Sequence, residues 1–181
     1  MKLIINRRKI VLLGLVACLA LLPLSVRAGD DAEVRGTVQR VFEQLKSRDY
    51  SALYNSLPAA AQLRMTRERF TSALQRAQDM YVLDRMDVGR VSVSNNFAVV
   101  DTVLYGRVVR PLQTEGKIVV QQYLVREDGQ WKVATGDNGT IKRFLASNPS
   151  FRARFPIRAP RIYVKQGNDW IEFNPPREPR R

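Results

Sequence analysis

The chain of 181 residues contains no histidine and only one cysteine. Without histidine there is no His-Asp dyad, no serine or cysteine nucleophile activated by an imidazole, and no imidazole metal site. Zinc-finger, RNP-type and phosphate-loop patterns are also missing from the sequence. These absences argue against histidine-dependent catalysis, imidazole metal sites and the common nucleic-acid-binding motifs, and we expect no metal, no cofactor and no nucleic acid partner.

Residues 1–28 have the order of a secretory signal peptide. A basic start with Arg7 and Arg8 precedes an apolar run over residues 10–22, and Ala28 is followed by an acidic segment. The run is shorter than the roughly 20 residues that a membrane-spanning helix needs. We therefore expect a periplasmic or secreted protein, which has no thiol if cleavage follows Ala28. Lipidation of Cys18, a twin-arginine route through Arg7 and Arg8, and an uncleaved anchor are the open alternatives.

Positive charge is concentrated near the C-terminus. The net charge is +13, and the leader holds five basic residues and no acidic one. Residues 142–181 hold ten Lys and Arg against three acidic residues, whereas residues 29–141 are close to neutral. Such asymmetry is typical of an interaction segment. After export, the polyanions available to it are lipid headgroups and glycans.

The hydrophobic pattern divides the body of the chain into two parts. Apolar residues recur at helical spacing over residues 30–47, where Asp30 and Glu33 resemble a capping box, and over residues 49–57, 59–64 and 67 to about 81. The acidic group Asp79, Asp84 and Asp87 is interpreted as a solvated helix end. Alternation with a period of two then predicts strands over residues 88–94, 96–109, 116–126 and 131–135. Helices followed by antiparallel strands predict an α+β fold with helices packed on a curved sheet.

Three stretches carry a resemblance to a known family. The segments "LKSRDYSALYNSLPAAA", "MTRERF" and the closing "DGQWKV" resemble the nuclear transport factor two-like superfamily of cystatin-like α+β rolls, over residues 33 to about 137. The resemblance implies a cone-shaped roll over residues 29–140. That superfamily includes ketosteroid isomerases, dehydratases and polyketide cyclases as well as non-catalytic binding and scaffold modules, so the fold alone does not decide the function. Pairing of two rolls through the exposed sheet face makes a homodimer a further expectation.

The side chains that point to one face of the predicted sheet are the candidate ligand-binding residues. The Asp128-Gly129 turn predicts that Arg126 lies opposite Trp131, and the next turn is expected to place Val109 opposite Ile118. On this register four side chains share the inner face of the cone: Asp101, Tyr105, Gln122 and Trp131.

Two interpretations of Asp101 follow. In an isomerase or lyase resembling the ketosteroid isomerases, Asp101 is the general base and Tyr105 assists by stabilising the oxyanion, with no cofactor. In the other interpretation Asp101 is a strand carboxylate that pairs with Arg107 or Arg126. Trp131 is expected to be a core anchor more than a stacking platform.

Residues 141–173 are expected to form a basic extension with a short helix over 141–147 and a small hairpin that turns at Gly167 and Asn168, followed by a disordered tail over 174–181. Apolar and basic residues alternate in this extension, so the apolar side chains can dock while the cations face outward. The candidates for binding an anionic membrane or glycan surface are Arg152, Arg154, Arg158, Arg161 and Lys165. The alternatives are that the extension only packs along the domain, or that it docks another envelope protein.

The sequence therefore predicts an exported, non-catalytic binding or scaffold domain of the bacterial cell envelope. Its ligand is expected to be a small molecule or an envelope partner. The cofactor-free isomerase or lyase based on Asp101 is the alternative.

Overall fold

The computed structural model describes residues 24–110, 113–134, 138–147 and 149–173. Residues 1–23, which include Cys18, and the tail predicted over 174–181 lie outside the described residues. The described helices are α2 Leu24–Lys46, α3 Tyr50–Asn55, α4 Ala59–Gln62, α5 Arg67–Gln78, α6 Asn138–Ser147 and α7 Pro149–Arg154. The described strands are β1 Tyr81–Ser94, β2 Phe97–Val108, β3 Thr114–Glu127, β4 Gln130–Val133, β5 Arg161–Gln166 and β6 Asp169–Glu172.

The helices begin where side chains can satisfy their first free N–H groups. Asp49 caps α3 by accepting a hydrogen bond from the Ala52 N–H at 3.0 Å, and Thr66 caps α5 in the same way. The capping box expected at Asp30 is wrong, because α2 already includes the residues before it. Asp30 instead accepts a hydrogen bond from the guanidinium of Arg126 on β3. None of the described helices combines the length and the apolar character needed to cross a membrane.

The strand β1 is longer than the sequence pattern suggested. It starts at Tyr81, so Asp84 and Asp87 lie on a strand and their interpretation as a helix end is wrong. The reason is tertiary: β1 pairs with β2 as far as Val108, which holds these residues in the extended state. A close approach helps this pairing, because a Cβ on Gly106 would lie 2.3 Å from the Val82 carbonyl oxygen.

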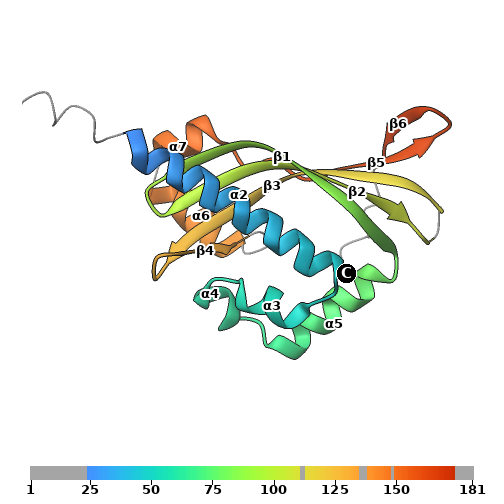
Figure 1. The fold of residues 1–181 in the computed structure, drawn as a ribbon, viewed down its shortest axis with the longest axis horizontal. Helices are drawn as coiled ribbons and strands as arrows, with labels where there is room; N and C mark the ends of the chain where they lie inside the picture. Colours follow the sequence, from blue (N-terminus) through green and yellow to red (C-terminus); the bar gives the residue numbers. More distant parts are fainter. Residues whose placement is uncertain (1–23, 111–112, 135–137, 148, 174–181) are drawn as a thin grey trace, which may run out of the picture.

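One antiparallel sheet joins the body of the chain to its C-terminal extension. The strand order is β1-β2-β3-β5-β6, and β4 pairs with β3 (Figure 1). The two ends of β3 have different partners, since residues 124–127 pair with β4 and residues 116–119 pair with β5. The predicted C-terminal hairpin is present as β5 and β6. Helices followed by a curved antiparallel sheet confirm the α+β roll.

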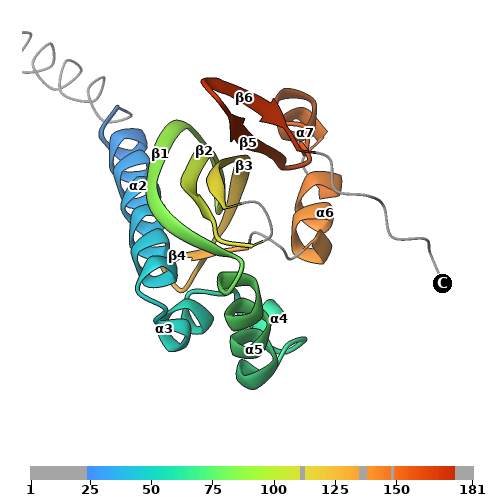
Figure 2. The ribbon, with the colours of Figure 1, turned by 90° about the vertical axis from the view of Figure 1, so that its right-hand side faces the viewer.

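Each face of the sheet has its own hydrophobic core. On one face Val34 and Val38 of α2 pack against residues of the sheet that include Leu124 and Trp131. On the other face Phe97, Val99 and Tyr123 pack against three residues of the extension, which are Ile141, Leu145 and Phe151. Figure 2 shows α2 and α6 on opposite sides of the strands. The extension is therefore an integral layer of the domain.

Candidate functional site

The register between β2 and β3 decides which candidate residues share a face. The predicted pair of Arg126 and Trp131 is confirmed. The expected pair of Val109 and Ile118 is wrong, because Ile118 lies opposite Leu104, five positions earlier. An odd shift in register moves every side chain of a strand to the other face. Here β2 ends at Val108 and pairs there with Thr114, which leaves only residues 109–113 in the turn.

The four inner-face candidates are consequently split between the two faces. Gln122 lies opposite Val100 and shares the α2 face with Trp131, whereas Asp101 and Tyr105 lie on the face covered by the extension. Along one strand, four residues separate Asp101 from Tyr105 by roughly 13 Å. The expected pair of a carboxylate and an assisting phenol is not formed.

Neither of the two ion pairs considered for Asp101 is present. Arg126 binds Asp30 and Glu33, and Arg107 lies 3.9 Å from Asp84. Tyr105 has a cation partner of its own, since the guanidinium of Arg85 lies 3.6 Å from the centre of its ring.

Asp101 lies in a recess of about 330 Å³ between the sheet and the start of β5. The recess is lined by Asp87 and Asp101 on the strands and by Arg158 and Arg161 on the extension. Strand β1 bulges beside it, because Gly89 and Arg90 have no partners between two regular pairs. The recess thus joins two features that the sequence presented as separate, the central carboxylate and the basic extension.

Gln121 connects the floor of this recess to the extension. It is 7% exposed, and its amide oxygen accepts hydrogen bonds from the Tyr123 hydroxyl at 2.8 Å and from the Arg158 N–H at 3.1 Å. Its amide nitrogen donates to Asp101 at 3.3 Å. Burial raises the pKa of Tyr123, so the phenol remains a hydrogen-bond donor at neutral pH. The arrangement positions the Asp101 carboxylate and holds the extension against the sheet.

Trp131 is a buried anchor on the α2 face. The residue is 6% exposed, and its ring lies under the guanidinium of Arg126, which is 4.5 Å from the ring centre. Gln122 is half-buried on the same face. Trp131 also lines a second pocket, at the flank of α2 and away from Asp101.

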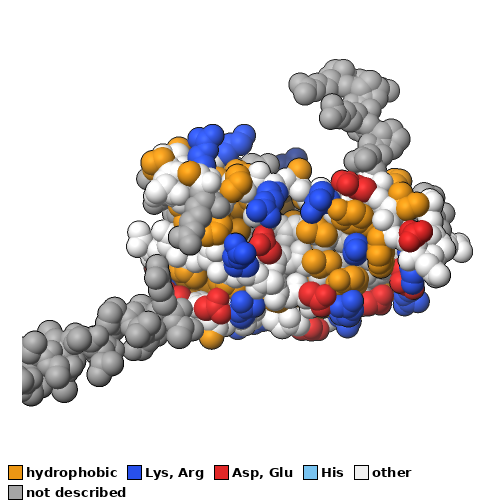
Figure 3. Space-filling model, turned by 90° about the horizontal axis from the view of Figure 1, so that it is seen from above, with side chains coloured by type: hydrophobic (Ala, Val, Ile, Leu, Met, Phe, Trp, Pro, Cys, Tyr) orange, Lys and Arg blue, Asp and Glu red, His pale blue; other side chains and the backbone are white. Residues whose placement is uncertain are grey.

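The basic candidates of the extension have different surroundings. Arg152, Arg158 and Arg161 are exposed, whereas Lys165 forms an ion pair with Glu115 at 3.0 Å. Arg154 is the last residue of α7, and its side chain lies outside the described residues. Figure 3 shows Lys and Arg side chains among apolar side chains on one face of the molecule. Three of the five candidate cations of the anchored extension are therefore exposed to solvent.

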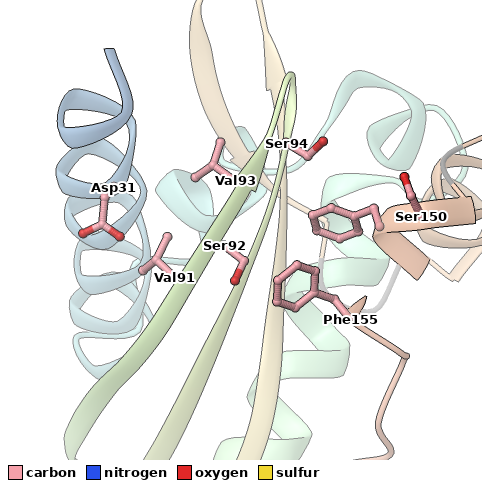
Figure 4. Close-up of a pocket in the computed structure, with 8 residues that line it drawn as sticks. Asp31, Val91, Ser92, Val93, Ser94, Ser150 and Phe155 are labelled. Atoms are coloured by element: carbon pink, nitrogen blue, oxygen red, sulfur yellow. The ribbon is translucent and has the colours of Figure 1, made fainter. Parts of the chain in front are cut away.

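A further pocket, of about 630 Å³, lies around the free edge of β1. Figure 4 shows Val91 and Asp31 on the α2 side of this strand, and Ser92 facing Phe155 on the other side. The pocket therefore extends over both sides of the edge strand. Its lining includes serine hydroxyls and one carboxylate, and it does not bring an acid and a base together.

Sequence reasoning missed Gln121 and Tyr123, which organise the Asp101 recess. The available signal was the polar pair Gln121 and Gln122 within an otherwise apolar strand. Only one residue of such a pair can face each side of a sheet. The wrong register selected Gln122. Among the described residues, no cluster of three or more acidic side chains or cysteines is arranged to hold a metal ion.

The fold and the recess together define an α+β roll with a polar site beneath a C-terminal layer. No protein-family model matches the chain, and no curated protein matches it. Among solved structures, the chain is similar to one from Campylobacter jejuni that carries the name NTF2-like transpeptidase. The identity is 11%, the TM-score is 0.38, and the match covers 59% of this chain and 95% of the other. That likeness concerns the fold, and no activity is transferred from it.

Proposed function

We propose that this protein is an exported, non-catalytic binding module of the bacterial cell envelope, and that its C-terminal extension contacts an anionic surface. The observation that carries the proposal is the fixed position of the extension. Phe151 is buried against the sheet and the Arg158 N–H is bound by Gln121, while the guanidinium groups of Arg152, Arg158 and Arg161 stay exposed. Cations on an anchored segment meet an anionic surface with little loss of backbone entropy.

The proposed export rests on the leader pattern of residues 1–28. The proposed lack of catalysis is supported by the geometry of Asp101. The Tyr105 phenol lies roughly 13 Å along the strand from Asp101. The Tyr123 phenol donates its hydrogen bond to the Gln121 amide oxygen, so neither phenol is positioned as an oxyanion donor beside Asp101.

The test compares two variants that lose the same charge. In the first, Arg152, Arg158 and Arg161 are each replaced by glutamine. In the control, three exposed arginines on or beside the N-terminal helices are each replaced by glutamine: Arg48, Arg69 and Arg76. Adsorption to phosphatidylglycerol vesicles and to acidic cell-wall glycans is measured at low salt. Each cation near an anionic membrane contributes about 1 kcal/mol, so the first variant should adsorb about 100-fold more weakly to the vesicles.

The control variant should adsorb as the wild type does, and added salt should weaken the adsorption of the wild type. Equal losses in both variants would show that net charge alone acts and that the extension has no special role. Adsorption that salt does not change would contradict an electrostatic surface contact.

A further inference from the structure

A pocket of about 610 Å³ lies at the flank of α2, where α3 and the turn between β3 and β4 approach it. It is separate from the Asp101 recess and contains no residue of the extension. Its volume falls within the roughly 300–1,000 Å³ of small-molecule sites. Three of its side chains come from separate elements: Arg40 of α2, Asn55 of α3 and Trp131 of β4.

The first sign of a ligand is an unpaired donor. The indole N–H of Trp131 is fully buried, and no acceptor in the described part of the chain lies within hydrogen-bond distance of it. A buried donor without an acceptor costs about 1–3 kcal/mol, and such groups are uncommon in native proteins. Trp131 is 6% exposed and lines the pocket, so a ligand there contacts the Trp131 side chain and reaches the covered N–H once neighbouring groups shift.

The second sign is positive charge that no carboxylate balances. Arg40 is positioned by a hydrogen bond to the Thr37 hydroxyl at 3.0 Å, and Lys132 by one to the Asn55 carbonyl at 3.2 Å. Within the described residues, neither cation forms an ion pair. Glu33 also lines the pocket, but its carboxylate is 3.1 Å from Arg126, which engages it. The pocket therefore favours an anion.

The third sign is the orientation of one amide. The Asn55 amide oxygen accepts a hydrogen bond from Arg67 at 2.9 Å, which fixes the orientation of the amide. Its NH₂ group remains available as a donor. Together with the indole and the two cations, the lining presents mainly hydrogen-bond donors.

We propose that this pocket binds a small anion rich in acceptor oxygens, of the acidic-sugar class. The carboxylate of such a ligand would be bound by Arg40 and Lys132, and its hydroxyl and ring oxygens by the Asn55 amide and, after a shift of the side chains that cover it, by the Trp131 indole. A charged hydrogen bond to each cation is worth more than a neutral one, so both cations contribute to affinity.

Glucuronate is the probe, and the signal is the indole N–H resonance of Trp131 in a nitrogen-15 correlation spectrum. The chain has two tryptophans, and Trp170→Phe identifies which peak belongs to Trp131. Millimolar glucuronate should shift that peak in a saturable way. Glucose, which lacks the charge, and acetate, which lacks the hydroxyls, should shift it little.

The variant with Arg40→Gln and Lys132→Gln should bind glucuronate about tenfold more weakly for each charge removed. The control with Arg69→Gln and Arg76→Gln should bind as the wild type does, because both residues lie on α5. An unmoved Trp131 peak would overturn the proposal, and so would equal shifts with acetate or unchanged binding by the first variant. The pocket shares no residue with the extension, so this result is independent of the surface-binding test.

Discussion

Replacing Gln121 with leucine should loosen the extension from the sheet. Gln121 is 7% exposed, and its amide oxygen is the acceptor for both the Tyr123 hydroxyl and the Arg158 N–H. A hydrogen bond in a folded protein contributes about 0.5–1.5 kcal/mol, so the loss of two should lower the free energy of unfolding by about 1–3 kcal/mol. For a chain of this size, each kcal/mol lowers Tm by about 2–4 °C.

Urea denaturation followed by circular dichroism measures the loss of global stability. Hydrogen exchange at the Arg158 amide measures the local loosening of the extension. The matched control is Gln75→Leu, the same change at an exposed position of α5, which should stay within about 0.5 kcal/mol of the wild type. A double-mutant cycle with Tyr123→Phe should give a coupling energy of about 0.5–1.5 kcal/mol. Zero coupling, together with unchanged exchange at Arg158, would refute the role given to Gln121.

Two further predictions concern the core and the pH dependence. Leu124→Ala should destabilise the protein by about 2–5 kcal/mol in urea denaturation, because Leu124 is fully buried in the α2-side core, whereas Leu63→Ala, at a residue 89% exposed, should have little effect. Burial, and then the proximity of Tyr50, raises the pKa of Tyr81 above its ordinary value of 10.0. Its stabilising contribution is therefore complete below pH 10 and decreases as the pH rises through the pKa of the folded state. Above pH 10, the free energy of unfolding measured by urea denaturation should decline less with rising pH in Tyr81→Phe than in the wild type. Equal declines in the two proteins would contradict this assignment.

Local signals in the sequence determined most of the elements, apart from the first half of β1 and the helix α7, and the turn between β3 and β4. The caps Asp49 and Thr66 begin helices at the start of the predicted segments 49–57 and 67 to about 81, since a side-chain oxygen and an N–H group two or three residues later suffice to form a cap. Asp128 and Gly129 both have positive φ, at 50° and 75°. Asp-Gly favours this conformation at the tip of a two-residue hairpin, so Arg126 had to face Trp131.

Tertiary structure alone decided which face each candidate occupies. Gln113 has a φ of 44° in the turn between β2 and β3, a conformation that the residue types around it do not predict. The register there follows from the packing of two hydrophobic faces, and it places Asp101 beside the extension while leaving Gln122 under α2. The same packing holds the extension on the sheet and leaves the indole N–H of Trp131 without an acceptor in the described chain. These arrangements depend on contacts between residues far apart in sequence, which a periodic pattern does not encode.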